Sequence, residues 1–530
     1  MLPVSGTIVE VMSRSSLLLA LLLLPSPQSS ADERRAVENA IIVSIDSVRA
    51  DHLSFHGYPR ATMPRLEALA KRRGALVFER ATAVSPACHP SHATLLLGLY
   101  PPQSGVPWCA ENAFDETPFD PSDPSDPSDM SDSGSEPRPL PMARKRASTI
   151  ANWLRIPEAN ETVAGFLGRQ GMRTGGFVSI WTIERRFGYD RGFDRFADEM
   201  PEYYGPQRLA WILRDGMRSQ RRQVGEATID RAIAYLDGLG ESERFFLFVH
   251  LADAHVPYDP RSQEPFAEDA AARRRLEALW GSRYPEATRE RAMKAMTRKD
   301  GFLLDLYDRA LRYADAQLGR LLEALERRGR LDETLVVVTS DHGDSMGQHR
   351  YLSAKLDHRL FFEHSLYVWE ETQHVPLIVL DPSVRRLERR TANVSQVDVA
   401  PTVIARLGFD PDDFGELPGR DLTALPEAPR IVYFLTFGRG RPGVWKRSYH
   451  EYPKFIGLRS ADVKFFVDRD RFRDADKGRC FLYDLAKDPN ELDNICAQTP
   501  EVTVDAYRRT LVRWYDRAVA GRKGSLTPGP

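Results

Sequence analysis

Two short apolar runs, far apart in the chain, each end at side chains that can bind a metal ion. Residues 41–45 lead into Asp46, and residues 334–339 lead into Asp341 and His342. Apolar runs of this length between polar segments are typical of strands buried on both faces of a parallel sheet. In open α/β sheets, ligands bind outside the carboxyl ends of the strands. The pattern therefore predicts an α/β fold with these three side chains at one edge of its sheet.

Further segments extend the same pattern. Residues 244–251 form another apolar run, and His255 follows it closely. Residues 305–330 carry apolar side chains at near-helical spacing, which predicts an amphipathic helix packed on the sheet. A glycine turn at Gly171 precedes a strand expected over residues 176–180. A histidine in a turn is commonly structural, but the position at a strand end favours a functional role for His255.

A single cysteine stands directly ahead of another apolar stretch with helical character. Cys88 is followed by Pro90, Ser91 and His92, and then by residues 93–97. Free backbone amides and the helix dipole favour negative charge at such a helix start, so this is a place to bind an anion. Taken alone, Cys88 would be a small buried hydrophobe, as most lone cysteines are. The metal-type clusters elsewhere favour a catalytic role instead.

Size and charge limit the class of protein. With 530 residues, 42% of them hydrophobic, the chain can bury a large core, and we expect one large domain plus a smaller one. Its 73 Lys and Arg residues nearly balance its 75 Asp and Glu residues. Nothing in this balance calls for nucleic acid or an anionic membrane surface as a partner.

The first 31 residues have the features of a secretory signal peptide. Arg14 precedes an apolar run at residues 17–24, and the small residues 29–31 follow it. A buried N-terminal helix is the alternative interpretation. Because the run is shorter than the about 20 residues that cross a bilayer, we expect no integral membrane anchor. The sequence thus predicts a secreted or periplasmic protein.

Residues 111–146 depart from a globular composition. They contain a Pro/Ser/Asp repeat with almost no apolar side chains. Such a segment cannot bury enough surface to offset its ordering entropy, so we expect a disordered acidic insertion.

The cysteine count leaves the disulfide pairing open. The sequence has four cysteines, and Cys480 and Cys496 are near enough to form a local bridge. In an oxidising compartment this bridge is plausible, but two free thiols explain the count equally well.

Taken together, these segments resemble the sulfatase family of the alkaline phosphatase superfamily. The family's nucleophile segment reads Cys-x-Pro-Ser-Arg, and this chain has the variant Cys-x-Pro-Ser-His, with His92 in the place of the arginine. The resemblance covers residues 38–515, apart from the insertion at 111–146. It implies an α/β catalytic domain over residues 38–415, with a large mixed sheet sandwiched by helices. A smaller C-terminal α+β domain with an antiparallel sheet would follow over residues 416–520.

The resemblance also implies a set of site residues around one divalent metal ion, which would be calcium by family expectation. The expected metal ligands are Asp46, Ser47, Cys88, Asp341 and His342. The expected catalytic residues are Cys88, His92, His255 and Lys355. Ser47 stands where many members have a second acid. An imidazole such as that of His342 also allows magnesium, manganese or zinc.

In sulfatases the cysteine is converted after translation to formylglycine, whose hydrate is the nucleophile. The resemblance therefore implies a formylglycine-generating or other sulfatase-maturing enzyme as a partner. That enzyme reads the arginine that His92 replaces here. Three outcomes stay open: conversion tolerates histidine, an unconverted thiolate acts, or the site is weak or inactive.

The implied function is metal-dependent hydrolysis of a sulfate monoester, carried by a small molecule or a glycan. Two alternatives stay open. Relatives with Thr-x-Pro-Ser-His include phosphotransferases, so a phosphoesterase or phosphotransferase on the same fold is the first. The second is a catalytically inactive relative that binds sulfate or glycan, because residues 179–181 replace the Gly-Lys-x-His of many members.

Overall fold

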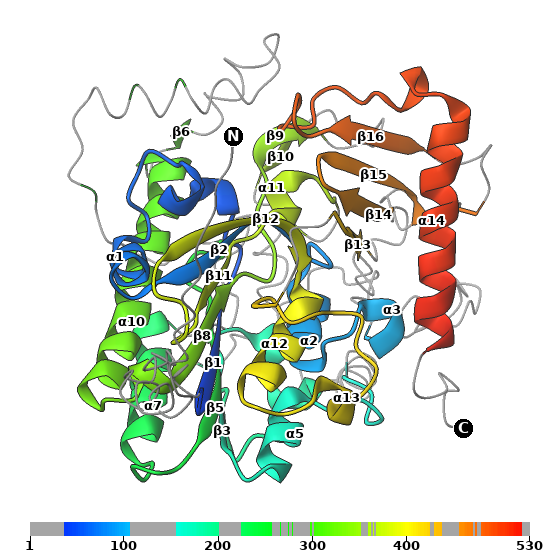
Figure 1. Ribbon diagram of the computed structural model, residues 1–530. Helices are drawn as coiled ribbons and strands as arrows, with labels where there is room; N and C mark the ends of the chain where they lie inside the picture. Colours follow the sequence, from blue (N-terminus) through cyan, green and yellow to red (C-terminus); the bar gives the residue numbers. More distant parts are fainter. Residues whose placement is uncertain are drawn as a thin grey trace, which may run out of the picture. The chain divides into compact units, whose positions relative to one another are not determined.

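An eight-stranded mixed sheet forms the centre of the fold (Figure 1). The computed structural model describes residues 37–106, 155–200, 224–256, 301–350, 367–424, 429–436, 455–469 and 479–521, with a few short pieces between them. The strand order is β12-β2-β11-β8-β1-β5-β3-β4. The strands are β1 (Asn39–Ile45), β2 (Ala75–Thr82), β3 (Arg173–Phe177), β4 (Arg195–Ala197), β5 (Phe245–Leu251), β8 (Thr334–Thr339), β11 (Leu377–Leu380) and β12 (Leu387–Ser395).

Neighbouring strands of this sheet run parallel except at β11. That strand pairs antiparallel with both β2 and β8. The expected large mixed sheet is therefore confirmed, and the two apolar runs that lead into Asp46 and Asp341 are the neighbouring parallel strands β1 and β8.

Helices cover both faces of the sheet, so every residue of β1 is buried. Ile41, Val43 and Ile45 pack into the core on one face, whereas Ala40 and Ile42 pack into the core on the other. This alternation follows from the two-residue period of a strand. The first face is covered by α1 (Pro64–Arg73), α7 (Gly225–Asp237) and α10 (Leu303–Arg327), and the second by α2 (Cys88–Leu97), α5 (Val163–Arg169) and α12 (Val399–Arg406).

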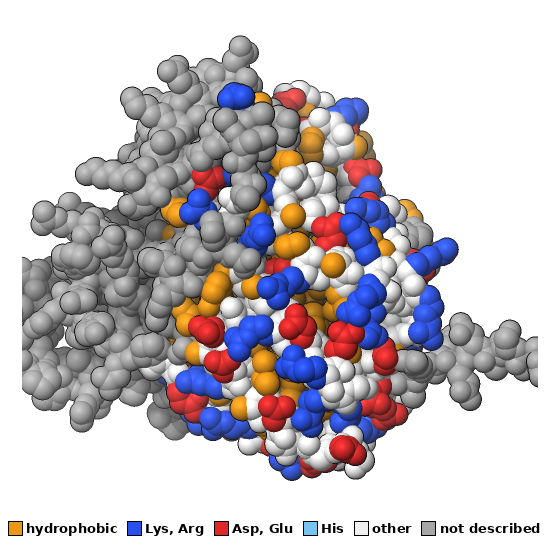
Figure 2. Space-filling view, turned by 90° about the vertical axis from the view of Figure 1, so that its left-hand side faces the viewer, with side chains coloured by type: hydrophobic (Ala, Val, Ile, Leu, Met, Phe, Trp, Pro, Cys, Tyr) orange, Lys and Arg blue, Asp and Glu red, His pale blue; other side chains and the backbone are white. Residues whose placement is uncertain are grey.

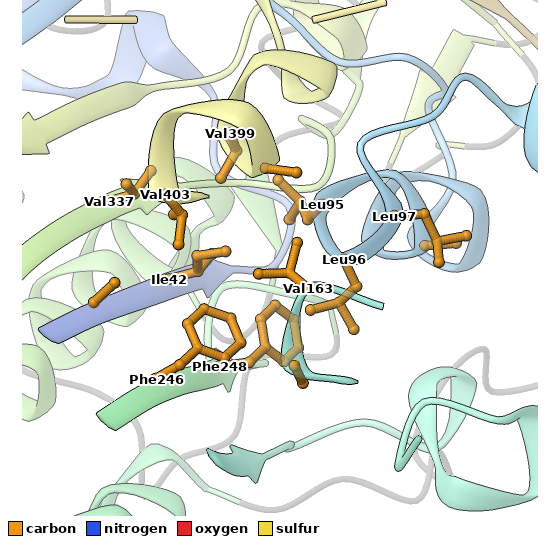
Figure 3. Packing of buried hydrophobic residues seen from close by; sticks show 14 of the residues in the cluster. Ile42, Leu95, Leu96, Leu97, Val163, Phe246, Phe248, Val337, Val399 and Val403 are labelled. Atoms are coloured by element: carbon orange, nitrogen blue, oxygen red, sulfur yellow. The ribbon is translucent and has the colours of Figure 1, made fainter. Parts of the chain in front are cut away.

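The packing on the second face fixes the position of α2 (Figure 3). Leu95 and Leu96 of α2 belong to the same buried cluster as Phe246 and Phe248 of β5 and Val399 of α12, with Leu95 toward Val399 and Leu96 toward Phe248. All ten residues of α2 are buried. The helix is therefore held along its whole length, and its first turn is set rigidly against the carboxyl edge of the sheet.

A second, smaller sheet of four antiparallel strands follows. Its order is β13-β14-β15-β16, with β13 (Ile431–Leu435), β14 (Phe455–Ser460), β15 (Val463–Asp468) and β16 (Cys480–Asp484). Helix α14 (Glu501–Ala520) packs on one face of it. A disulfide joins Cys480 to Cys496, which settles the pairing that the sequence left open. The expected smaller α+β part with an antiparallel sheet is thereby confirmed.

The remaining α-helices and strands of the described residues are short. They are α3 (Pro101–Ser104), α11 (Glu370–Gln373), α13 (Pro411–Phe414), β6 (Thr297–Arg298), β7 (Gly301–Phe302), β9 (Met346–Arg350) and β10 (Arg359–Phe361). Within the described ranges, no helix is long and apolar enough to cross a membrane. The expected signal peptide at 1–31 and the insertion at 111–146 lie outside the described residues.

The strand expected over residues 176–180 is displaced, since β3 covers Arg173–Phe177. The strand begins three residues earlier than expected and includes Gly175 as well as Gly176. A Cβ atom on Gly176 would meet the ring of Phe196 at 2.4 Å. The glycine is thus required by close packing of a neighbouring aromatic side chain against the strand.

The side of the molecule that carries α1, α7 and α10 has interspersed positive and negative side chains (Figure 2). Ion pairs join some of them across helices, such as Arg72 with Glu326 at 2.8 Å and Arg320 with Asp230 at 2.5 Å. Exposed pairs of this kind contribute little to stability. This face is therefore a solvated helical surface of mixed charge.

Candidate active site

A tight turn after β1 places the carboxylate of Asp46 at the edge of the sheet. Ser47 adopts a left-handed backbone conformation with φ 63°, which costs free energy for a residue other than glycine. The Ser47 amide donates to Asp341 Oδ1 at 3.1 Å, and its hydroxyl donates to Asp46 Oδ1 at 3.0 Å. The serine thus holds two carboxylates from different strands in place.

Asp341 and His342 leave the end of β8 beside this turn. The side-chain amide of Gln396 donates to the carbonyls of Ser340 and Asp341, at 2.9 and 2.7 Å, and so holds the segment. His342 Nδ1 lies 2.7 Å from the Gly343 carbonyl. Because a carbonyl can only accept, Nδ1 carries the proton, and the lone pair of Nε2 faces the site.

Cys88 is the first residue of α2, and its sulfur points at the same place. Sγ lies 3.2 Å from His342 Nε2 and 3.9 Å from Asp46 Oδ2. Burial, and then the carboxylates of Asp46 and Asp341, raise the pKa of the Cys88 thiol well above its ordinary value. Without a cation in the site, the side chain is therefore a protonated thiol.

Asp46, Cys88, Asp341 and His342 together form a buried group whose ligand atoms all lie within 4.8 Å of one another. Asp341 Oδ2 is fully buried and has no hydrogen-bond partner among the described residues. Burial would raise the pKa of Asp46, but the neighbouring histidines hold it well below its ordinary value. Two carboxylates, an imidazole lone pair and a sulfur converging on one point fit a divalent metal ion.

Comparison with known proteins identifies the family. The family model described as Sulfatase matches residues 38–409, which is most of the chain. The chain belongs to the sulfatase family. This membership confirms the resemblance noted in the sequence and assigns the chain to a metal-dependent family of sulfuric ester hydrolases.

Curated sulfatases match different shares of the chain. Arylsulfatase K of Gallus gallus is 30% identical over 211 residues, which cover 38% of this chain and 35% of that protein. The match thus spans only about a third of that relative's length. An arylsulfatase of Clostridium perfringens is 21% identical over 523 residues, which cover 93% of this chain and 96% of that protein.

Solved structures share the fold over nearly the whole chain. A Bacteroides fragilis protein classed as a sulfatase superposes with a TM-score of 0.63 at 19% identity, covering 92% of this chain and 98% of that one. The phosphonate monoester hydrolase of Agrobacterium radiobacter has a TM-score of 0.57 at 21% identity, covering 91% and 96%. These likenesses confirm the fold class expected from the sequence.

His92 stands where other sulfatases have the motif arginine. Its Nδ1 donates to the Cys88 carbonyl at 2.7 Å, and its Nε2 lies 3.0 Å from the Ser44 hydroxyl. Burial lowers the pKa of His92 to about 4. The side chain is therefore neutral at pH 7 and does not supply the positive charge of the arginine that it replaces.

One further histidine, His250, was not predicted as a site residue. It lies in β5 and pairs in register with Ser44 of β1. Its Nδ1 accepts from the Ser179 amide at 3.4 Å, and its Nε2 lies 3.5 Å from Asp46 Oδ2. Since Nδ1 accepts, Nε2 carries the proton, and it lies within ion-pair distance of the carboxylate without forming a hydrogen bond to it. The only hint of this contact in the sequence was a polar residue inside each of two otherwise apolar strands, Ser44 in β1 and His250 in β5.

Of the other two expected catalytic residues, the structure describes His255 but not Lys355. His255 is buried, and its ring lies 4.9 Å from that of His364, which stacks on His342 at 4.4 Å. His364 Nδ1 lies 3.4 Å from Asp344 Oδ1. Lys355 lies outside the described residues.

Proposed function

We propose that this sulfatase-family protein is a metal-dependent hydrolase of sulfate monoesters, with a nucleophile derived from Cys88. The observation that carries the proposal is the convergence of Asp46, Cys88, Asp341 and His342 within 4.8 Å in a buried site. Residues from three distant segments meet there at the carboxyl edge of the sheet, where α/β folds bind ligands.

The proposed metal ligands are the two carboxylates and the Nε2 atom of His342. Ser47 was also expected in this ligand set, and its hydroxyl supports the proposal by orienting Asp46. A bound divalent ion, calcium by family expectation, would neutralise charge on the ester oxygens and activate the nucleophile. The four residues that surround that position are all buried.

The proposed nucleophile requires a change at Cys88. Its thiol has a raised pKa in this buried, acidic site, and a protonated thiol is a poor nucleophile. We therefore propose that a sulfatase-maturing enzyme converts the side chain to formylglycine: an oxidant supplied with that enzyme takes two electrons from Cβ, the Cβ–S bond breaks with release of hydrogen sulfide, and water supplies the aldehyde oxygen. His92 would hold the first turn of α2 during catalysis, through its contact with the Cys88 carbonyl.

His255 and Lys355 are the proposed contacts to the sulfate group and its leaving oxygen. The buried position of His255 near the metal-type cluster supports this role. We propose a sulfate ester of a small molecule or a glycan as the substrate, and a secreted or periplasmic location that follows from the expected signal peptide.

The test combines a mass measurement with an assay. The tryptic peptide that contains Cys88 should be roughly 18 Da lighter than its thiol form after conversion, in contrast to the mass gained when oxygen adds to a thiol. The converted protein should hydrolyse an aryl sulfate, and the Cys88→Ala variant should not. Activity that is unchanged in Cys88→Ala would contradict the proposal.

A phosphoesterase or phosphotransferase is the second candidate, because the fold is shared with a phosphonate monoester hydrolase. Aryl sulfate, aryl phosphate and aryl phosphonate should be compared at equal enzyme concentration. A higher kcat/KM on the phosphorus esters would favour the second candidate. Metal binding without turnover of any ester would favour the inactive binding relative.

A further inference from the structure

We propose that, while Cys88 keeps its sulfur, the cluster of Asp46, Cys88, Asp341 and His342 is a zinc site. The atom carried by residue 88 would then decide which class of divalent ion the protein selects. The inference rests on the proposed function only in taking this cluster as the metal centre.

The chemical types of the four donor atoms favour zinc. The sulfur of Cys88 lies 3.2 Å from Nε2 of His342. Thiolate and imidazole are preferred zinc ligands, and zinc also accepts carboxylate oxygens. Calcium and magnesium take oxygen ligands almost exclusively. With sulfur present, two of the four converging donors suit zinc and do not suit a hard cation.

The distances between donor atoms also bear on the choice of zinc. The separations are 3.2 Å from Cys88 Sγ to His342 Nε2, and 3.3 Å from that nitrogen to Asp341 Oδ2. Asp46 Oδ1 lies 3.8 Å from the same nitrogen, and Asp46 Oδ2 lies 3.9 Å from the sulfur. Zinc bonds of about 2.0–2.3 Å in a tetrahedron place neighbouring ligands roughly 3.3–3.6 Å apart. Two separations from His342 Nε2 already match that arrangement, and the remaining donor atoms, all within 4.8 Å of one another, must move closer by up to about 1.5 Å.

Two further observations point to a ligand. Asp341 Oδ2 is fully buried, has no hydrogen-bond partner among the described residues, and is one of the converging donors. The described residues also form a second candidate group of Cys88, His342 and His364. Both groups contain the same sulfur and the same imidazole, so a cation held by either of them meets the sulfur.

The consequence is a link between the chemistry of residue 88 and metal choice. Zinc binding would release the thiol proton to solvent as the zinc–sulfur bond forms. An oxygen in place of the sulfur would leave one nitrogen among oxygen donors, which suits harder cations. Cys88→Ser makes this exchange without any maturing enzyme, so it isolates the effect of the donor atom.

The experiment uses the full chain, made without a sulfatase-maturing enzyme, with the mass of the Cys88 peptide confirming an intact thiol. Metal-stripped protein is titrated with Co²⁺ and its absorption is recorded, and zinc and calcium affinities are measured by competition with a chelator. Wild type should show a sulfur-to-cobalt charge-transfer band in the near ultraviolet. Cys88→Ser should lose the band, and its zinc affinity should fall by at least about a hundredfold, because even outer partners of a metal site contribute about 10–100-fold.

The Cys109→Ser variant is the matched control for a second thiol in the sequence, and it should keep both the band and the zinc affinity. Thermal unfolding in chelator shows whether each variant folds like wild type. Equal cobalt spectra and zinc affinities in wild type and Cys88→Ser would overturn the inference and leave the proposed function intact. Failure of every form to bind any divalent ion would overturn the proposed function as well.

Discussion

Asp341 uses its two carboxylate oxygens for different purposes. Oδ1 accepts hydrogen bonds from the amides of Ser47 and His342, at 3.1 and 2.9 Å. Oδ2 has no hydrogen-bond partner among the described residues and lies 3.3 Å from His342 Nε2. The first oxygen therefore holds two loops together, and the second is available to a cation.

This division predicts the effect of Asp341→Asn. The amide oxygen can keep the two backbone hydrogen bonds, but the side chain loses its negative charge toward the metal. We expect metal affinity to fall by at least about a hundredfold, while the free energy of unfolding in chelator changes by less than about 1 kcal/mol. Competition titration and urea unfolding measure the two quantities. A variant that binds metal like wild type would exclude Asp341 as a ligand.

His250 supports Asp46 through a single atom, which allows a sharp comparison of variants. In His250→Gln the side-chain nitrogen can take the place of Nε2 beside Asp46 Oδ2, whereas His250→Leu removes the N–H group. We expect metal affinity to fall by about 10–100-fold in the leucine variant and to be largely kept in the glutamine variant. Both affinities can be measured without turnover. Equal losses in the two variants would indicate a packing role only.

Residue positions could be predicted from the sequence where a polar side chain directly follows an apolar run. Asp46, Asp341 and His342 were predicted on that basis, and the structure brings them together with Cys88. His250 was missed because it lies inside its strand, and its importance depends on register. Strand register is a tertiary property that one sequence does not display.

At the scale of elements, the turn after β8 depends on a glycine for a reason of space. A Cβ atom on Gly343 would lie 2.2 Å from the carbonyl oxygen of Glu371 and 3.2 Å from Cγ of Arg49. The first contact is to backbone, which cannot rotate away. The segment that carries Asp341 and His342 therefore packs directly against the chain around α11.

Gly343→Ala should accordingly displace the turn and disturb the site. We expect a loss of roughly 2–3 kcal/mol in the free energy of unfolding, together with weaker metal binding. Gly238→Ala is the control, since its Cβ atom would meet backbone oxygens at 3.5 and 3.7 Å, which is ordinary contact. Urea unfolding and metal titration of both variants test the prediction. Wild-type behaviour of Gly343→Ala would contradict the close packing.

The sequence predicted several strands of the main sheet, but not their arrangement. Uninterrupted apolar runs predicted β1, β5 and β8 because such strands are buried on both faces. The order of the strands and the reversed direction of β11 follow from long-range pairing. The start of β3 was placed too late: the strand includes Gly175, whose Cβ position lies 3.0 Å from side-chain atoms of Leu247 and Tyr235, and glycine is uncommon inside strands.

At the scale of the whole molecule, buried charges join the four-stranded antiparallel sheet to α11. Lys464 of β15 lies 3.0 Å from Glu370 of α11 and 3.0 Å from Glu491. Arg459 of β14 also contacts Glu370, at 2.9 Å. Burial would raise the pKa of Glu370, but Arg459 and Lys464 lower it to about 2. Burial raises the pKa of Glu491 to about 7, even though Lys464 attracts its charge.

The raised pKa of Glu491 predicts a pH dependence of stability with a definite sign. Between its ordinary value of 4.5 and about 7, the folded protein keeps the carboxyl proton while the unfolded chain has lost it. Folding is therefore linked to proton uptake in this window, and the contribution of Glu491 falls as pH rises. At about 1.4 kcal/mol per pKa unit, the decline amounts to roughly 3 kcal/mol.

Urea unfolding of wild type and Glu491→Gln between pH 4.5 and 8 isolates this contribution, because glutamine does not titrate. The stability of wild type relative to the variant should decline by roughly 3 kcal/mol as pH rises across this range. Glu326→Gln is the control. Hydrogen bonds from Arg72 and Arg73 lower the pKa of Glu326 to about 2, so its effect should not change over the same range. A constant difference for Glu491→Gln would mean that Lys464 keeps Glu491 ionised at every pH in this range.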